Sequence, residues 1–293
     1  PPPPPPPPPP PFFFQADDGI RDRSPSRGLG DVYKRQVIPD GTFLSANPTA
    51  PMGLYSATLP TVIDTIVRAV GKGSPRAVAG GHHASFSAHW FFGNDPATGE
   101  LFQQLDTGHG GWGATENADG SGPFKTMAHG DTLDVPVEVQ ESLNPILIES
   151  VGLRPDSAGD GARRGGLGTE KIVRVLADCQ VSVQIDRTFC APWGVEGGSD
   201  GQPGESFAEY QDGEARRILK GTISLASGDR FRLKTSGGGG YGKPIDRDAA
   251  DVAEDVAAGY ITPDRARDVY GVVLDVGGNV DSAATKNARD ALR

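Results

Sequence analysis

Apolar residues recur at intervals of three and four in one early stretch of the chain. This spacing predicts a helix at 59–71 that presents one apolar face. Pro60 suits the first turn of such a helix, and Gly71 suits its end. The apolar face is formed by Leu59, Val62, Ile63, Ile66, Val67 and Val70.

Alternating positions replace the helical spacing in the next part of the chain. Residues 77–105 alternate small and aromatic side chains around a turn at 94–99, so we expect a hairpin there. A glycine-rich loop is expected at 106–132. It leads into a strand and a short apolar piece at 133–149.

Strands dominate the sequence from residue 169 onward. Val181, Val183 and Ile185 lie on one face of a strand, because side chains alternate between the two faces of a sheet. Two more strands are expected within 217–235, with a Ser-Gly-Asp turn between them. The glycines of 236–242 would then reverse the chain into a helix.

The last fifty residues have helical character. Thr262 suits a helix N-cap with Pro263 at the first helical position, and a final helix is expected to start near Asp281. These patterns together predict an α+β fold. We expect a strand-rich core of mixed or antiparallel sheets, sandwich- or barrel-like, with a few peripheral helices and a helical C-terminal tail. The expected parts are 37–168, 169–242 and 243–293.

Residues 1–36 lack both helical and strand periodicity. Eleven prolines open the chain, and the string after them resembles translated adapter sequence at the end of a metagenomic contig. We expect this segment to be non-native, not to pack against the rest, and Val37 to lie in the middle of a gene. A disordered proline-rich leader, or a ligand for a small recognition domain, is the alternative.

Charge excludes several classes of function. Without residues 1–36 the chain has 23 basic and 34 acidic residues, so it has no surplus cations for nucleic acid or for an anionic membrane. No apolar run approaches the roughly 18 residues of a transmembrane span. Two cysteines fit a reducing compartment, and we expect a cytoplasmic protein.

All five histidines fall within 48 residues of one another. Imidazoles near carboxylates serve metal or acid–base chemistry, yet no pair shows a recognised metal-ligand spacing. Adjacent His82 and His83 would point to opposite faces of a strand. We take His82, His83 and His109 as candidates for lining a site, and expect His82 or His83 within about 10 Å of His109. Histidines scattered over turns and interfaces are the alternative.

Other motifs have plainer interpretations. The glycines of 236–242 could hold a phosphate but lack the spacing of a nucleotide loop. Arg163 and Arg164 could bind an anion or flank a surface turn. Cys190 has no neighbouring histidine in the sequence, and Ser85 and Ser87 lack the context of a serine hydrolase.

Several segments in order resemble the hydantoinase B/5-oxoprolinase B-subunit family. The most specific are SGGGGYG and the KPIDRDAADVAEDVAAGYITPDRARDVYGVVLD that follows it. PDGTFLSANPTAP, AGGHHASFSAHWFFG, GHGGWGAT, ESLNPILIES, DGARRGGLG and DRTFCAPWGVEGG precede them. The resemblance covers residues 37–293 and corresponds to the C-terminal half of a complete B-type family member.

The resemblance implies ATP-dependent opening of a cyclic amide such as a hydantoin or 5-oxoproline. It further implies an A-type ATPase partner, which phosphorylates the substrate oxygen, and a divalent metal held by the N-terminal half of the B-type chain. The metal ligands surround an NDPY-type motif, which NDPATG at 94–99 does not match. No metal ligand is therefore assigned in this chain, and such a fragment would be inactive alone.

Two other functions stay open. The glycine-rich tail also resembles acetone and acetophenone carboxylases, whose corresponding polypeptide is the first alternative. A non-catalytic, β-rich binding or assembly module is the second.

Overall fold

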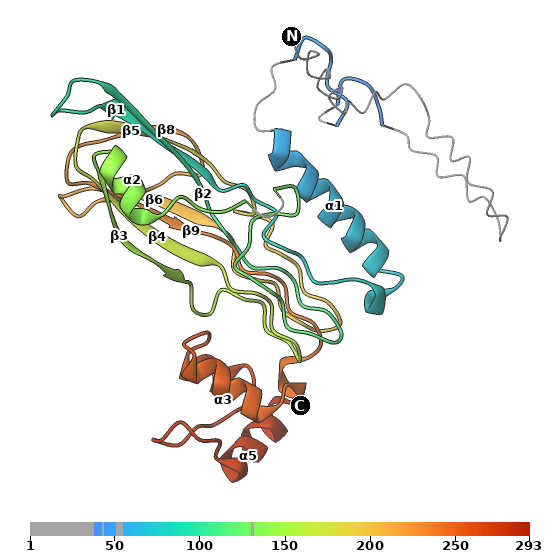
Figure 1. Ribbon diagram of the computed structural model, residues 1–293. Helices are drawn as coiled ribbons and strands as arrows, with labels where there is room; N and C mark the ends of the chain where they lie inside the picture. Colours follow the sequence, from blue (N-terminus) through green and yellow to red (C-terminus); the bar gives the residue numbers. More distant parts are fainter. Residues whose placement is uncertain (1–37, 43, 51–54, 130–131) are drawn as a thin grey trace, which may run out of the picture. The chain divides into compact units, whose positions relative to one another are not determined.

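The computed structural model describes residues 38–42, 44–50, 55–129 and 132–293 (Figure 1). The chain forms two compact units, Pro1–Pro51 and Met52–Arg293. In the first, Thr42 and Ser45 close a small turn, and Thr42 Oγ1 donates a hydrogen bond to the carbonyl of Pro39. The expectations for residues 1–36 lie outside the described residues. Everything below concerns the second unit.

Two open antiparallel sheets form the core of this unit. The four-stranded sheet has the order β2-β1-β5-β8, and the five-stranded sheet has the order β3-β4-β9-β6-β7. The strands of the first are β1 (Ala88–Asn94), β2 (Leu101–Thr107), β5 (Cys179–Gln184) and β8 (Lys220–Leu225). Those of the second are β3 (Ile146–Leu153), β4 (Thr169–Val175), β6 (Glu205–Glu209), β7 (Ala215–Arg217) and β9 (Arg230–Lys234).

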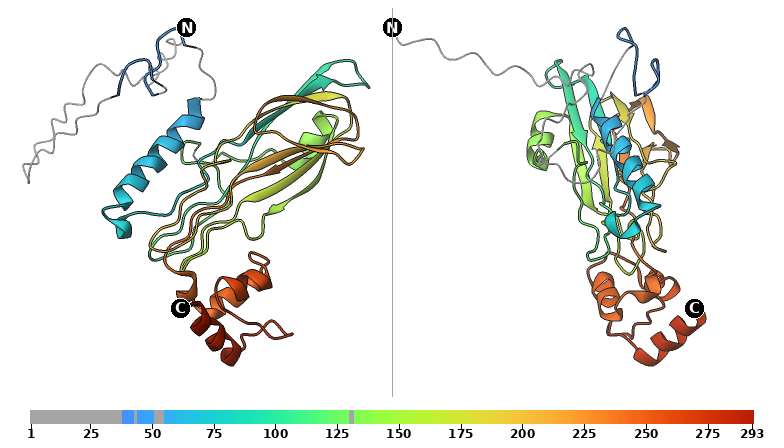
Figure 2. Two further views of the ribbon diagram at one scale, coloured as in Figure 1. Left: turned by 180° about the vertical axis from the view of Figure 1, so that it is seen from behind. Right: turned by 90° about the vertical axis from the view of Figure 1, so that its right-hand side faces the viewer.

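The two sheets pack face to face as a sandwich (Figure 2). Phe91 of β1 and Phe231 of β9 meet edge to face, with ring centroids 5.7 Å apart. The predicted face of Val181, Val183 and Ile185 is buried in this core. The expected α+β class with antiparallel sheets is therefore confirmed, in its sandwich form.

Connections between consecutive strands often pass from one sheet to the other. The hairpin of β1 and β2 closes as predicted, with Asp95 N–H donating to the carbonyl of Glu100. The Ser-Gly-Asp turn, by contrast, carries the chain from β8 in one sheet to β9 in the other. The strand predicted at 133–149 is wrong in its first part, where helix α2 (Val137–Leu143) precedes β3.

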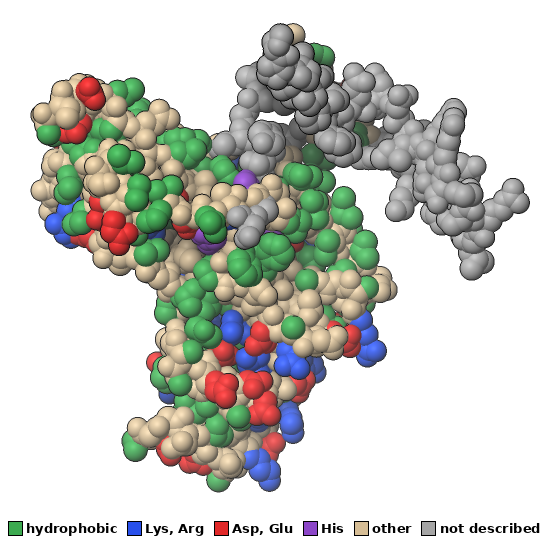
Figure 3. All heavy atoms as spheres, viewed as in Figure 1, with side chains coloured by type: hydrophobic (Ala, Val, Ile, Leu, Met, Phe, Trp, Pro, Cys, Tyr) green, Lys and Arg blue, Asp and Glu red, His purple; other side chains and the backbone are tan. Residues whose placement is uncertain are grey.

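Helix α1 spans Tyr55–Gly71, four residues longer at its start than predicted. Pro60 therefore lies inside the helix and not in its first turn. Leu59, Ile66 and Val70 of the predicted apolar face are more than half exposed, whereas the one acidic residue, Asp64, is buried. Figure 3 shows hydrophobic side chains along this helix. The face that α1 buries thus combines Asp64 with Val67, which packs against the buried cluster of Trp193 and Tyr241.

Glycine-rich segments form a bundle between the sandwich and the C-terminal helices (Figures 1 and 2). Successive N–H groups of the central segment donate to different neighbours: Gly238 to the carbonyl of Gly166, Gly239 to Gly81 and Gly240 to Ser199. Only glycine fits where the backbones of these segments touch, because an added Cβ at Gly238 or Gly239 would overlap a neighbouring carbonyl group. The segments lie at about 80–84, 110–114, 157–168, 192–202 and 236–241.

The bundle overturns three expectations. The glycines of 236–242 continue an extended segment and do not reverse the chain at a sheet edge. His82 and His83 lie in the bundle and not at the start of a strand, which begins at Ala88. Arg164 is buried rather than at a surface turn. Backbone-to-backbone packing of glycine leaves no periodic signal in the sequence, so periodicity alone predicts loops where these extended segments lie.

The C-terminal helices are α3 (Ala249–Ala257), α4 (Pro263–Asp268) and α5 (Ser282–Leu292). Thr262 caps α4 as predicted, its hydroxyl accepting a hydrogen bond from Arg265 N–H. Tyr270 and Val252 are among the buried residues of a separate small core. Short 3₁₀ turns lie at Pro75–Ala77 and Pro244–Asp246.

Ion pairs attach these helices to the bundle. The Arg247 guanidinium binds both carboxylate oxygens of Asp119 at 2.7 Å, and Arg265 binds both oxygens of Asp160. Arg164 in turn pairs with Asp255 of α3 at 3.2 Å. Charged side chains gather over this end of the molecule in Figure 3. Bidentate pairs fix orientation as well as distance, so these contacts set how the helical end meets the glycine bundle.

Candidate functional site

The five histidines lie in and beside the glycine bundle, in two different kinds of surroundings. His82 and His83 are buried, with 3% and 0% of their surface exposed. Among the three candidates His109 is the exception, since 23% of its side chain is open to solvent. Burial therefore separates the three candidates that the sequence grouped together.

Asp64 of α1 anchors His82. Its carboxylate lies 3.1 Å from His82 Nδ1 and accepts a hydrogen bond from Trp193 Nε1 at 2.9 Å, and it also pairs with Arg187. Burial alone would raise the pKa of Asp64, but the hydrogen bond from His82 and the charge of Arg187 lower it overall. The carboxylate is thus ionised and ties α1 to the bundle.

His83 packs against the loop that carries His109. A Cβ built on Gly110 would lie 2.5 Å from the His83 ring, so the residue after His109 touches this imidazole. Neither ring nitrogen of His83 has a hydrogen-bond partner within the described part of the chain. Burial holds the pKa of His83 well below its ordinary value, and the ring is uncharged. The two histidine-bearing segments therefore lie side by side.

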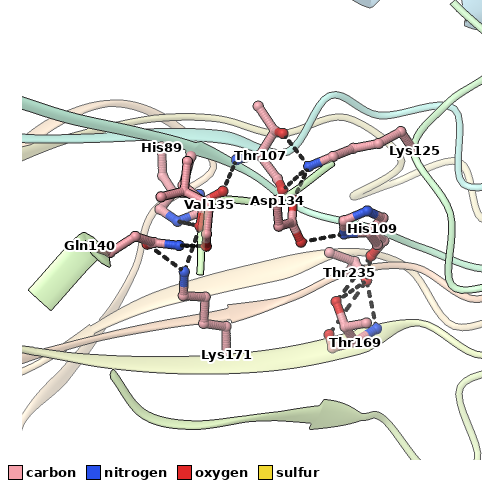
Figure 4. Close-up of polar contacts among 11 residues, drawn as sticks. His89, Thr107, His109, Lys125, Asp134, Val135, Gln140, Thr169, Lys171 and Thr235 are labelled. Carbon is pink, nitrogen blue, oxygen red and sulfur yellow. Dashed lines mark hydrogen bonds and ion pairs between the residues drawn. The ribbon is translucent and has the colours of Figure 1, made fainter. Parts of the chain in front are cut away.

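His109 is held at both its backbone and its ring (Figure 4). Its carbonyl accepts hydrogen bonds from the hydroxyls of Thr235 at 2.5 Å and Thr169 at 3.0 Å. Its Nδ1 lies 3.0 Å from Oδ2 of Asp134. The other carboxylate oxygen of Asp134 accepts from Lys125 Nζ at 2.7 Å. One carboxylate thus bridges a buried ammonium group and the imidazole.

The protonation state of His109 follows from these contacts. Burial lowers its pKa most, Lys125 lowers it further, and Asp134 and Asp106 raise it, with a net shift below the ordinary value. The ring is therefore mostly uncharged at neutral pH. A lone pair on Nδ1 would be repelled by the carboxylate oxygen 3.0 Å away, so the electrostatics favour the tautomer with its proton on Nδ1 and its lone pair on Nε2.

Two cavities meet at His109 and Asp134, which line both of them. The smaller, about 130 Å³, extends toward β4 and α2. The larger, about 680 Å³, is walled by Trp112, Phe124 and Leu133, among others. A volume of this size, apolar walls and a few convergent polar groups are typical of small-molecule sites.

A second polar network closes the smaller cavity (Figure 4). Lys171 Nζ lies 2.5 Å from Oδ2 of Asp106 and 3.3 Å from Oε1 of Gln140. His89 Nε2 lies 3.8 Å from the same oxygen of Asp106. Burial lowers the pKa of His89 to about 4, so it is a neutral core residue. The polar groups of this network contact one another and are not free to bind a ligand. The larger cavity is therefore the better candidate site.

The remaining candidates are accounted for by packing. Ser85 Oγ accepts a hydrogen bond from the backbone N–H of Asp186, and Arg164 forms an ion pair with Asp255. Burial raises the pKa of the Cys179 thiol to about 12, whereas Cys190 is exposed. No group of three or more potential metal ligands converges anywhere in the described ranges, from which Asp131 is excluded.

Sequence reasoning missed Asp64, Lys125 and Asp134. Asp64 carried little signal, because at helical spacing it lies outside the predicted apolar face, beside its edge at Val67. Asp134 lies 25 residues from His109 and Lys125 lies 16, and no local pattern connects them. Only the course of the loop brings these charges together.

Comparison with known proteins identifies the chain. The family model for hydantoinase B/oxoprolinase matches residues 25–244. The chain belongs to the hydantoinase B/oxoprolinase family. This confirms the resemblance seen in the sequence motifs.

Two relatives from Pseudomonas are similar over most of this chain. The putative B subunit of a D-/L-hydantoinase from Pseudomonas sp. strain NS671 is 29% identical over 86% of the chain and 43% of its own length. The beta subunit of caprolactamase from Pseudomonas jessenii is 30% identical over 91% of the chain and 48% of its own length. The chain therefore spans less than half of these relatives.

Solved structures show the same fold. The crystal structure of ATP-dependent caprolactamase from Pseudomonas jessenii superposes with a TM-score of 0.76 at 28% identity, over 87% of this chain and 46% of that one. Acetone carboxylase in its nucleotide-free form superposes with a TM-score of 0.67 at 23% identity, over 76% of this chain and 35% of the carboxylase chain. The second likeness establishes the fold alone.

Proposed function

We propose that this chain is part of the B subunit of an ATP-dependent hydrolase that opens a cyclic amide. The match to the hydantoinase B/oxoprolinase model over residues 25–244 carries the proposal. The names of the relatives support it, since they include the B subunit of a hydantoinase and the beta subunit of a caprolactamase. The cavity beside His109 supplies a site of suitable size in this half.

The chemistry explains why ATP and a second polypeptide are needed. An unstrained amide is a poor electrophile, and phosphorylation of its oxygen creates a good leaving group. In this proposal an A-type ATPase partner supplies the phosphorylation. A divalent metal belongs to the other half of the B subunit. The described residues offer no ligand set for it, and we derive no step through the metal.

The three candidate histidines receive different roles. His109 is the one with an open ring nitrogen, and we assign it to the wall of the substrate site. His82 and His83 are buried, and they position the loop of residues 108–113 from behind. The lowered pKa of His83 fits this role, because burial disfavours the charged form of the ring and leaves it neutral against the backbone of the loop.

The cysteines bear on the cellular setting of the complex. Both are free thiols, one of them exposed, as is usual in a reducing compartment. We therefore place the complex in the cytoplasm. Separately, no helix in the described stretches is long and apolar enough to cross a membrane.

The proposal is tested with the complete B subunit that carries this segment, coexpressed with an A-type ATPase partner. Caprolactam, hydantoin and 5-oxoproline are supplied separately with ATP and a divalent metal, and ADP and the ring-opened product are measured. At least one ring should stimulate ADP release together with ring opening. Stimulation by acetone and bicarbonate instead would indicate the carboxylase alternative, and no stimulation by any substrate would indicate a binding module.

The 293-residue chain alone is the control. It should neither hydrolyse ATP nor open any of the three rings, because its glycine-rich segments are occupied by packing against one another. Turnover above background by the chain alone would contradict this part of the proposal.

A further inference from the structure

His109 lies in the mainly apolar wall of the larger cavity. Phe124 and Leu133 are 53% and 85% exposed, although both are large hydrophobic side chains. His109 Nε2 has no hydrogen-bond partner among the described residues, and it is not one of the buried unpaired atoms. Exposed apolar walls around an unpaired polar atom indicate a ligand that covers both.

Lys125 cannot provide a donor to such a ligand. Its ammonium group has three protons, and three acceptors already lie around it: the carbonyl and hydroxyl oxygens of Thr107 and Oδ1 of Asp134. The Lys125 side chain is only 4% exposed. The positive charge of Lys125 therefore holds the Asp134 carboxylate in place, and this carboxylate in turn orients the His109 ring.

The electrostatics of the cavity disfavour an anion. Asp134 is 47% exposed at its side chain and carries a negative charge in the wall. The adjacent Nε2 presents a lone pair, and the ammonium group of Lys125 is neutralised by Asp134. A ligand carboxylate placed here would meet a like charge and a second acceptor, with no free cation among the described wall residues to compensate.

We propose that this cavity binds an uncharged cyclic amide, whose ring packs on Phe124 and Leu133 and whose N–H donates to Nε2 of His109. The inference rests on the proposed function and narrows its substrate class. Neutral lactams and hydantoins fit the site, whereas 5-oxoproline, which carries a carboxylate, does not.

The open nitrogen gives a direct test on the full 293-residue chain. Diethyl pyrocarbonate acylates accessible, uncharged imidazole nitrogens, and peptide mass spectrometry reads each histidine separately. The other four histidines each have at least one buried ring nitrogen without a partner among the described residues. Their remaining nitrogens are hydrogen-bonded, or in His83 also buried. His109 should therefore react fastest.

Caprolactam at saturating concentration should slow the acylation of His109 by about 10-fold, because the bound ring covers Nε2. The same concentration of 5-oxoproline should slow it less than about 2-fold. Equal protection by the two compounds, or protection by neither, would overturn the proposal.

Two phenylalanine variants provide the matched control. Phe124→Ala should abolish protection by caprolactam without slowing the acylation of His109 in its absence. Phe189→Ala removes another ring, 83% exposed and outside the cavity, and should leave protection unchanged. Protection that survives Phe124→Ala, or is lost in Phe189→Ala, would contradict the assignment of the cavity.

This result is distinguishable from the test of the proposed function. If the complete complex opens caprolactam while His109 remains unprotected, the cavity assignment fails and the proposed function stands. If caprolactam protects His109 while the complex opens no ring, the proposed function fails and the binding site stands.

Discussion

Asp64 of α1 and His82 of the glycine bundle form a buried hydrogen-bonded pair, with 3.1 Å between Oδ1 and Nδ1. The same carboxylate also binds Arg187 and Trp193, from a segment more than 120 residues later. Most of the apolar side chains of α1 remain at least partly exposed. The helix is therefore held to the bundle by one buried carboxylate with its donors and by Val67, which packs against the cluster of Trp193 and Tyr241.

Asp64→Asn should lower the free energy of unfolding by about 3–5 kcal/mol, because it leaves the buried Arg187 guanidinium without its counter-charge. Urea denaturation of the purified chain measures the change. Thr65→Ala, at the next and exposed position of the same helix, is the control and should cost less than about 0.5 kcal/mol. Equal losses in the two variants would contradict the role of Asp64.

The pKa of His109 should respond in opposite directions to its two charged neighbours. Asp134→Asn should lower it further, because the carboxylate stabilises the charged ring, and Lys125→Met should raise it. NMR titration of the imidazole resonances measures both shifts. Burial and the charge of Lys125 also lower the pKa of His129, so it should rise as well in Lys125→Met, and His129 serves as an internal reference for Asp134→Asn alone. A pKa that rises in Asp134→Asn would show that the carboxylate does not contact His109.

Stability should decrease as pH falls from about 6.5 to about 4. Burial lowers the pKa of His89 from 6.5 to about 4, so between these values the unfolded chain binds a proton that the folded chain does not. The difference between these two pKa values corresponds to about 3 kcal/mol of folding free energy. Above about pH 6.5 this loss of stability is absent. His83, whose pKa is also lowered by burial, adds to the loss in the same direction.

The variant His89→Gln isolates the contribution of His89 to this pH-dependent loss of stability. The variant should lose less stability than the wild type between about pH 7 and about pH 4.5, as measured by urea midpoints at each pH. Asp64, Asp106 and Asp119 have pKa values lowered below 3.8, so their contributions are lost at lower pH and do not interfere. Parallel losses in wild type and variant would rule out His89 as a source.

Gly238→Ala should prevent folding or cost more than about 4 kcal/mol. The added Cβ would overlap the carbonyl oxygen of Trp112, which is backbone and cannot move aside. Gly152→Ala in β3 is the matched control, since nothing lies within 4 Å of its Cβ position. It should be neutral or slightly stabilising, because glycine weakens strand interiors. Circular dichroism and urea denaturation compare the two variants.

Local patterns predicted the elements whose signals are local. The alternation at Val181, Val183 and Ile185 identified a buried strand face, and Thr262 with Pro263 identified the start of α4. The same reasoning failed at 133–149, where a short helix precedes the strand. So short a helix offers too few periods to separate it from an extended segment.

His109 could be selected from the sequence because glycines surround it. Its orientation could not, since it depends on Asp134 and on the buried Lys125, which lie in a loop without periodicity. His82 and His83 looked equivalent to it in the sequence. They differ because the bundle covers both of them and leaves one nitrogen of His109 open.

The sequence by itself determined the α+β class, the strand faces, the C-terminal helix caps and the family, because these depend on spacing and on motifs within a few residues. The tertiary structure decided which sheet each strand joins, which face of α1 is buried and which histidine remains accessible. Those outcomes depend on backbone contacts between glycines and on charge pairs far apart in the chain. Glycine has no side chain that could give a periodic hydrophobic pattern in the sequence. A carboxylate meets a partner far away in the sequence only after the chain has folded.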